Sequence, residues 1–395
     1  MKVFPRHQID IRPSDLSAGL LSYCIPLNRV QLEKEILLLW EKEYVRVSFT
    51  VRTALDSIFT AASFPEGSEV LMSAINIKDM VKIAENHGLH VIAVDLHIGD
   101  LSITPESLEK LISPKTKVLI FAQLFGVIAD LEPVYEVCRK YNILMIEDCA
   151  QAFCGSRYYG SQFADVSLFS FGAIKSSTAL GGAIVAAKSE RYIKETDSIE
   201  KSYPNRGEFW FFKRLLKYSV FKTLSTPRIY GLFIGMLTLF RYDIEKTING
   251  FLKSFPNGEL ISQIRFQPPL RLLFLLRRRL KSNNDNNFFL REKAARSFLN
   301  NLDSSFTIPG KTAKYNSFWV LPILSDTPEK LQKLLLKHGF DSTQGKNLLM
   351  AIYKSRNART IIEQILYLPD ITRMTRKYRK RLVSVLCFEK NGYKS

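Results

Sequence analysis

Two neighbouring stretches, NILMIEDCAQAFCG (residues 142–155) and ADVSLFSFGAIKSSTALGG (residues 164–182), decide the fold of this 395-residue chain. The first contains the apolar run 143–146, which ends on two carboxylates, and the second contains the apolar run 166–171. Short apolar runs bounded by charge are typical of buried strands in a parallel sheet. Ligands of such sheets bind at the carboxyl ends of the strands. Asp148, which follows the first run, is therefore predicted to lie at a binding site.

Lys175 follows the second run, among apolar and small residues and just before a pair of glycines. Burial of a lysine favours its neutral form, and a neutral amine can form a Schiff base with a carbonyl group. A lysine Schiff base, with a carboxylate beside a pyridinium nitrogen, is the usual way in which proteins hold pyridoxal phosphate (PLP). The alternative is that Asp148 caps a helix and Lys175 is an ordinary loop lysine, and the residues alone leave both interpretations open.

Four polar residues of these stretches occur in the order and spacing of the cofactor site of the DegT/DnrJ/EryC1/StrS aminotransferases: Asp148, Gln151, Ser170 and Lys175. The chain thus resembles this family of fold-type I enzymes, which are best known for aminating keto sugars. The resemblance implies that Asp148 binds the pyridine nitrogen of PLP, Gln151 its ring hydroxyl and Ser170 its phosphate. It also implies that Lys175 forms the Schiff base and serves as the catalytic base. Many members have His or Tyr after the Ser-Phe pair, where this chain has Gly172.

The turn around residues 50–53 is a third candidate region, because β-branched alternation changes there to helical spacing. The first turn of a helix attracts phosphate groups. Family members have Ser-Gly-Thr or Gly-Arg at this turn, so the resemblance makes Arg52 and Thr53 candidates for binding the cofactor phosphate. The alternative is that Arg52 lies on the surface of a first helical turn. Asn76 is a candidate at the position where family members usually stack an aromatic side chain on the cofactor ring.

Strands alternate with helices through residues 44–187, which predicts a mostly parallel sheet wrapped by helices. The expected strands are residues 70–73, 90–94, 117–126, 143–146, 166–171 and 183–187. The expected helices between them are residues 77–86, 108–112 and 131–141. The fold class is therefore α/β, and the resemblance implies the fold-type I PLP transferase fold.

A smaller α/β domain is predicted at the C-terminus. Its expected elements are helices over residues 288–302, 328–338 and 372–388 and strands over residues 318–323 and 365–369. We divide the chain into an irregular N-terminal arm (1–30), a large PLP-binding domain (31–195), a basic, apolar helical insertion with dimer helices (196–287) and the small C-terminal domain (288–395).

Residues 201–241 hold eight basic residues, many aromatic residues and a single acid, Glu208. The uncharged run 229–240 is too short to cross a bilayer, which needs about 20 apolar residues. A basic, aromatic-rich and apolar segment can instead lie on a membrane surface. The alternative, which we favour because apolar helices are commoner in protein cores, is that these helices pack on a partner subunit or over the active site.

The formal net charge of +18 attracts nucleic acid, anionic lipid or phosphorylated substrates. No helix-turn-helix, zinc-finger or RNA-binding signature accompanies this charge, so nucleic acid is not expected as a partner. The five cysteines are scattered without metal-ligand spacing, which predicts a reduced compartment and no metal site. No apolar signal region follows Met1, which predicts that no signal peptide is present.

These observations predict a PLP-dependent aminotransferase. The expected donor is an amino acid such as glutamate, and the expected acceptor is a keto or aldehyde group, as in a keto sugar or a lipid-linked carbonyl. Two alternatives stay open: another PLP reaction such as dehydration, and a non-catalytic membrane-surface binding protein on the same fold. The resemblance implies a homodimer. The expected location is cytoplasmic, with contact to the inner face of the membrane as an open alternative.

Overall fold

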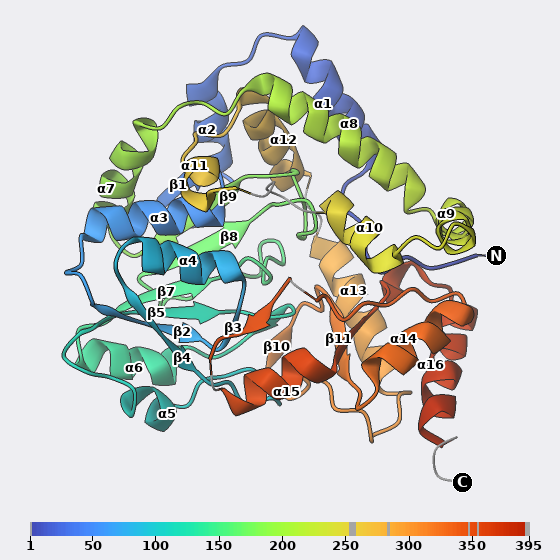
Figure 1. The fold of residues 1–395 in the computed structure, drawn as a ribbon. Coiled ribbons are helices and arrows are strands. Elements are labelled where there is room, and N and C mark those ends of the chain that lie inside the picture. The colour runs from blue at the N-terminus through green and yellow to red at the C-terminus, as the bar shows by residue number, and fades with distance from the viewer. Residues whose placement is uncertain (1, 253–257, 283–284, 347, 354, 392–395) are drawn as a thin grey trace.

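The computed structural model describes residues 2–252, 258–282, 285–346, 348–353 and 355–391 (Figure 1). Its central sheet has seven strands in the order β1-β9-β8-β7-β5-β2-β4. They are β1 (Tyr44–Ser48), β2 (Glu69–Ser73), β4 (His90–Val94), β5 (Thr116–Ala122), β7 (Leu144–Asp148), β8 (Val166–Ser170) and β9 (Ala183–Ala187). Strand β9 is antiparallel to both of its neighbours, and the strands from β8 to β4 are parallel. The predicted mostly parallel α/β sheet is therefore confirmed.

Helices cover both faces of this sheet (Figure 1). One face carries α3 (Val51–Ala62), α4 (Lys78–Asn86) and α7 (Glu190–Lys201), and the other carries α5 (Pro105–Glu109) and α6 (Glu132–Lys140). Successive strand residues point to opposite faces. In β5, for example, Val118 and Ile120 pack in the apolar cluster of α3 and α4, whereas Leu119 and Phe121 pack in the cluster of α6. The continuous apolar runs of the sequence are thus explained by burial on both sides.

The predicted elements of this part all occur, and the largest displacement of an end is at β5. This strand was expected to reach residue 126 but ends at Ala122. Phe125 and Gly126 both have positive φ angles, 61° and 98°, which an extended strand does not accommodate. The chain turns there, at the carboxyl edge of the sheet.

The N-terminal arm is not irregular throughout, as the sequence had indicated. Helix α1 (Pro13–Leu21) and a 3-10 turn (Ser22–Cys24) lie within it, before α2 (Arg29–Leu37). Pro13, which suggested a break, instead occupies the first turn of α1, where a proline loses no helical hydrogen bond. Asp15 accepts a hydrogen bond from the Arg12 amide and caps the same turn.

The predicted helical insertion does consist of helices in its described part, and residues 253–257 and 283–284 of it lie outside the described residues. The helices are α8 (Glu208–Leu224), α9 (Pro227–Leu239), α10 (Ile244–Leu252), α11 (Leu260–Ile264) and α12 (Leu270–Lys281). Phe211, Leu215 and Tyr218 of α8 recur at helical spacing and are buried in a cluster with α12 and α1. In the described parts of the chain, none of the helices has the length and apolar character needed to span a bilayer.

The C-terminal elements surround a separate apolar cluster. They are α13 (Asp285–Leu299), β11 (Leu321–Leu324), α14 (Pro328–Lys337), β13 (Ile365–Leu368), a 3-10 turn (Ile371–Arg373) and α16 (Arg376–Asn391). Helix α15 (Arg356–Gln364) belongs to the same part of the chain but packs in the apolar cluster of α6. β11 begins three residues later than predicted, because Phe318 has a positive φ of 49°. Two separate two-stranded antiparallel sheets tie this part to the segments that follow β5 and β2: β10 (Tyr315–Asn316) with β6 (Val127–Ile128), and β12 (Met350–Ala351) with β3 (Ile75–Asn76). The division of the chain into four parts stays a prediction.

Candidate active site

A cavity of about 1430 Å³ opens at the carboxyl edge of the central sheet. Its walls come from segments far apart in the chain: the N-terminal arm, the loops after β5, β7 and β8, helices α8 and α10, and the segment around Trp319. Six of the seven residues predicted to bind a cofactor line it, namely Arg52, Asn76, Asp148, Gln151, Ser170 and Lys175. Thr53, the seventh, does not line it. The carboxyl edge of the sheet, where open α/β sheets bind their ligands, therefore has a cavity.

Asp148 ends β7 and is almost fully buried at the cavity. Its Oδ1 accepts a hydrogen bond of 2.9 Å from the Ala150 amide. Burial raises the pKa of this carboxyl group, and the charges of Lys175 and Arg52 act in the opposite direction. Among the described residues no cation lies within ion-pair distance of Asp148. The carboxylate therefore lies buried beside an open space in which a cationic group would be favoured.

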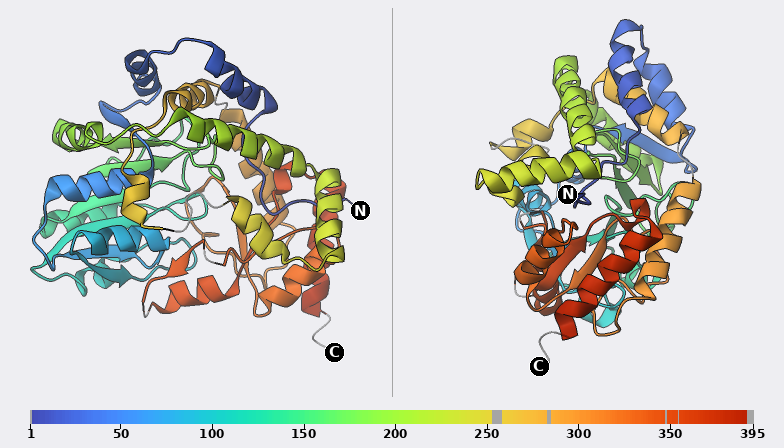
Figure 2. Two further views of the ribbon diagram at one scale, coloured as in Figure 1. Left: turned by 45° about the horizontal axis from the view of Figure 1, so that its top comes forward. Right: turned by 90° about the vertical axis from the view of Figure 1, so that its right-hand side faces the viewer.

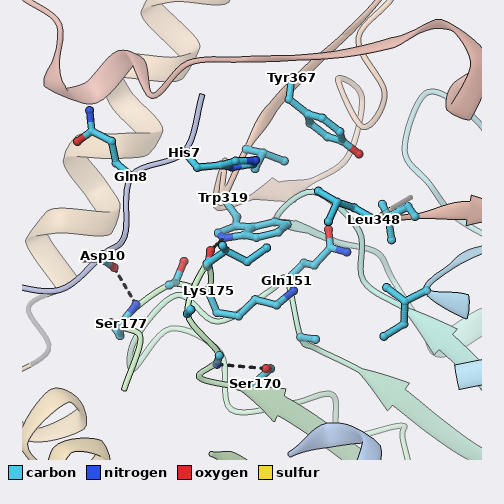
Figure 3. Close-up of a pocket in the computed structure, with 18 of the residues that line it drawn as sticks. His7, Gln8, Asp10, Gln151, Ser170, Lys175, Ser177, Trp319, Leu348 and Tyr367 are labelled. Carbon is cyan, nitrogen blue, oxygen red and sulfur yellow. Dashed lines mark hydrogen bonds between the residues drawn. The ribbon is translucent and has the colours of Figure 1, made fainter. Parts of the chain in front are cut away.

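Lys175 lies on the loop between β8 and β9, and its side chain enters the cavity (Figure 3). Its Nζ lies 4.5 Å from the centre of the Trp319 ring, and Trp319 is held by a hydrogen bond of 3.1 Å from Nε1 to the Ile174 carbonyl. Burial lowers the pKa of Lys175 to about 8; the charge of Asp148 opposes this shift, and that of Arg52 adds to it. No carboxylate of the described chain pairs with Nζ. The neutral fraction of this amine near pH 7 is thus much larger than that of an ordinary lysine.

The lowered pKa of Lys175 predicts how this residue reacts with an amine-selective reagent. Only the neutral amine is nucleophilic, so labelling of Lys175 should rise with pH through a midpoint near 8. The measurement is competitive labelling of the cofactor-free protein with acetic anhydride, followed by quantitation of the Lys175 peptide. In the chain unfolded by denaturant, the same peptide should shift to the ordinary lysine value of about 10.4. An unchanged midpoint on unfolding would contradict the burial of this amine.

Gln151 and Ser170 lie on the same side of the cavity as Lys175 (Figure 3). The Gln151 Oε1 accepts a hydrogen bond of 2.8 Å from the amide of Phe125, one of the two residues with positive φ after β5. Ser170 is the last residue of β8, and its Oγ accepts a long contact of 3.4 Å from the Gly172 amide. Both side chains therefore have hydrogen-bonding capacity left for a ligand.

The turn before α3 places its residues differently from one another. Thr50 caps the helix by accepting a hydrogen bond of 3.0 Å from the Thr53 amide, and Arg52 forms an ion pair of 2.6 Å with Asp79 at the cavity wall. Thr53 is fully buried, and its hydroxyl donates to the Ile264 carbonyl at 2.7 Å. The first turn of α3 thus faces the cavity through residues 50–52, whereas Thr53 faces the protein interior.

Asn76 lies at the cavity wall on the short strand β3. Its Oδ1 accepts a hydrogen bond of 2.8 Å from the Ile77 amide, whereas the buried Nδ2 has no partner. A buried amide donor without an acceptor is costly. An acceptor atom of a bound ligand would satisfy it.

The N-terminal arm also lines the cavity, which the sequence did not indicate. His7, Gln8 and Asp10 line the cavity on the side opposite the sheet (Figure 3). Asp10 accepts a hydrogen bond of 2.7 Å from the Ser177 amide, which ties the arm to the lysine loop. His7 is enclosed: burial, together with the charge of Arg6, lowers its pKa to about 4, and its Nε2 has no hydrogen-bond partner. No local pattern in the sequence points to these contacts, because they join residues about 170 positions apart.

The described residues contain no group of three or more His, Cys, Asp or Glu side chains able to hold a metal ion.

Residues 29–203 match the model of the DegT/DnrJ/EryC1/StrS aminotransferase family. This segment makes up less than half of the chain. It contains Arg52, Asp148, Ser170 and Lys175, so the family region and the sheet edge of the cavity coincide. Among curated relatives, GDP-perosamine synthase of Escherichia coli O157:H7 is 32% identical over 152 residues. The alignment covers 37% of this chain and 42% of that enzyme, so the chain matches less than half the length of this relative.

Solved aminotransferases of low sequence identity share the fold over nearly the whole chain. The Helicobacter pylori aminotransferase PseC, involved in the biosynthesis of pseudoaminic acid, superposes with a TM-score of 0.71 at 18% identity, over 98% of this chain and all of PseC. TlmJ from Streptoalloteichus hindustanus gives 0.72 at 13% identity, over 99% and 100% of the two chains. The putative sugar aminotransferase Spr1654 of Streptococcus pneumoniae, solved with PLP, gives 0.71 at 14%, over 98% and 99%. The fold shared with these solved aminotransferases therefore extends beyond residues 29–203.

Proposed function

We propose that the chain is a PLP-dependent sugar aminotransferase whose cofactor occupies the cavity at the sheet edge. The observation that carries this proposal is that one easily neutralised amine, Lys175, and one buried carboxylate, Asp148, line the same cavity. The family match of residues 29–203 and the relationship to GDP-perosamine synthase support the reaction class.

The residues of the cavity suit this cofactor. PLP supplies an aldehyde for a lysine and a ring that accepts electrons from the substrate. A protonated ring nitrogen would provide the cation that Asp148 lacks, and the unpartnered Asn76 Nδ2 would gain an acceptor. Ser170 and the start of α3 with Arg52 offer donors to a phosphate group. Thr53 has no part in this assignment, because its hydroxyl is engaged with Ile264.

The chain's own residues divide the work as follows. Asp148 would hold a protonated ring nitrogen, and Gln151 would offer the ring a hydrogen bond. Lys175 would hold the cofactor aldehyde and, as a free amine, would act as general base, for which a pKa near working pH is best. The N-terminal arm, through His7 and Gln8, closes the opposite side of the cavity against water.

We propose glutamate as the amino donor and a keto sugar, or a carbonyl compound linked to a lipid, as the acceptor. Beyond the cofactor residues the cavity wall carries more cations than carboxylates, which suits an acceptor that carries phosphate. The cationic side chains are Arg6, Arg12, Lys78, Lys82, Arg214, Lys246, Arg279, Arg291, Lys346 and Arg373, and the carboxylates are Asp10, Asp79, Asp243, Glu245 and Asp370. We also propose that the chain forms a homodimer and is located in the cytoplasm.

A half-reaction tests the proposal. Purified protein loaded with PLP should show the visible absorbance of a lysine-linked cofactor, and L-glutamate should discharge this band with one equivalent of 2-oxoglutarate formed. Added nucleotide-linked 4-keto sugar should then restore the band. Cofactor binding without discharge by glutamate would favour another PLP reaction, and failure to bind PLP would favour a non-catalytic scaffold; either result would overturn the proposal.

A further inference from the structure

Two consecutive helices, α8 and α9, lie on the outside of the molecule (Figure 2). Each of them exposes large apolar side chains. The exposed residues recur at spacings of three, four or seven positions within each helix, so they lie along one side of each. They are Phe209, Leu216 and Val220 of α8 and Ile229, Leu232, Met236 and Leu239 of α9. We name this set the α8–α9 stripe. Its members are exposed by 39 to 76%, and apolar residues that gather in one exposed patch mark an interaction surface.

The opposite side of α9 is packed in the usual way. Tyr230, Ile234 and Leu237 are buried, and Tyr230 also donates a hydrogen bond to Asp341. The helix is therefore held in place by its inner face. The outer stripe is not needed to anchor it to the protein.

A second, smaller cavity of about 600 Å³ lies at the start of α9. Four cationic side chains line it, Lys2, Lys222, Arg228 and Arg373, and no carboxylate does. We name it the cationic cleft. Ile229, the first residue of the α9 part of the stripe, also lines this cleft. An apolar face and a cluster of cations thus meet on one surface.

The positive charge continues beyond the cleft. The Lys2 Nζ lies 4.7 Å from the ring centre of Tyr378 on α16, and the first turns of α16 expose Arg376, Lys377 and Lys380. Among the described residues none of these three cations forms an ion pair. Inside the cleft, burial lowers the pKa of Lys222 to about 8, and the nearby Arg373 and Arg279 act in the same direction, whereas Asp10 and Asp370 oppose it. Arg373 pairs with Asp370 at 3.7 Å, whereas Lys2, Lys222 and Arg228 form no ion pair among the described residues, so the cleft keeps an excess of positive charge.

We propose that the α8–α9 stripe lies on a membrane surface rich in anionic phospholipid, and that the cationic cleft binds the phosphate of a lipid headgroup. Apolar helix faces flanked by basic residues bind in the plane of such surfaces, with the apolar side chains among the acyl chains. Basic side chains near the surface add attraction to anionic lipid. A second copy of the chain fits less well, because a symmetric contact through this face would bring the two sets of cations together.

Co-sedimentation with vesicles tests this inference on the full chain, without cofactor or substrate, so its outcome is independent of the proposed aminotransferase activity. The chain should bind phosphatidylcholine vesicles that contain phosphatidylglycerol and should not bind pure phosphatidylcholine vesicles. The double variant Leu232→Glu/Met236→Glu should bind at least about 10-fold more weakly, as should the charge variant Lys2→Glu/Arg228→Glu. Raised salt should weaken the binding of the wild type.

The matched control is Val30→Glu/Leu38→Glu, the same change at two apolar residues of α2 that are 75 and 74% exposed. This variant should bind vesicles like the wild type. Circular dichroism of each variant identifies any that fails to fold, and the charge variant, which removes no apolar group, then carries the test. Equal binding to both kinds of vesicle, or unchanged binding by both the apolar and the charge variants, would overturn the proposal. So would a loss of self-association in the α9 variant with no vesicle binding by the wild type, since the stripe would then be a contact between copies.

Discussion

Replacing Lys175 by arginine is expected to abolish amino transfer, with kcat lowered by about 10⁴-fold or more. Arginine is similar in length but stays protonated at all accessible pH values, so the cavity would no longer hold a neutral amine. The pKa of about 8 at Lys175 shows how much the wild-type site favours that neutral form. The measurements are 2-oxoglutarate formation from glutamate at saturating acceptor and the absorbance of lysine-linked PLP. Both should be lost.

Lys188→Arg is the matched control for this variant. Lys188 follows β9, and burial lowers its pKa as well. Its Nζ donates a hydrogen bond of 2.7 Å to the Phe163 carbonyl and lies outside the cavity. The control should retain activity. Borohydride reduction of the wild type with PLP should label the Lys175 peptide, and a label on another lysine, or a lysine-linked cofactor in Lys175→Arg, would refute the assigned role.

Replacing Asp341 by asparagine is expected to lower the free energy of unfolding by about 3 kcal/mol, since the buried Arg6 then keeps only Glu245 as a charged partner. Asp341 is completely buried, and its two oxygens accept hydrogen bonds of 2.7 and 2.8 Å from Arg6, whose side chain is 2% exposed. Tyr230 donates to the same carboxylate, and Glu245 pairs with Arg6 at 2.5 Å. Four segments meet in this cluster. The measurement is the denaturant midpoint and slope of the purified variant.

Glu329→Gln provides the comparison within the same C-terminal part. Glu329 pairs with Lys346 at 2.9 Å, and both side chains are about 60% exposed. Exposed pairs contribute little to stability, so its unfolding midpoint should match that of the wild type. Equal midpoints for both variants would show that the Arg6–Asp341 pair does not hold the segments together.

The sheet-edge half of the site was predictable because its residues are local in the sequence. Asp148 and Gln151 follow one strand, Ser170 ends the next and Lys175 follows it, and β7 and β8 pair directly. Local spacing therefore fixes which residues meet there. The start of α3 was predictable in the same way, but the direction of each side chain in its first turn was not. Thr53 faces Ile264 in the interior, whereas Arg52 reaches the cavity.

The other half of the site depends on contacts between distant segments, which a single sequence does not reveal. His7 and Trp319 both line the cavity although they are far apart in the sequence. The prolines of the first 30 residues suggested an irregular arm, because proline both starts and ends helices. For the C-terminal part, the order of elements was predictable, whereas the start of β11 was displaced by the positive φ of Phe318.

The contacts of the first residues have a consequence for how the protein is made. The amide of Val3 bonds to the Pro227 carbonyl and that of Phe4 to the Gly339 carbonyl, and the Asp341 amide bonds back to Phe4. Translation proceeds from the N-terminus, so Val3 and Phe4 are synthesised long before their partners Pro227, Gly339 and Asp341. Until these partners are synthesised, the backbone groups of Val3 and Phe4 stay without them. The cavity is therefore completed only after the C-terminal part has been synthesised, and it is open in the nascent chain.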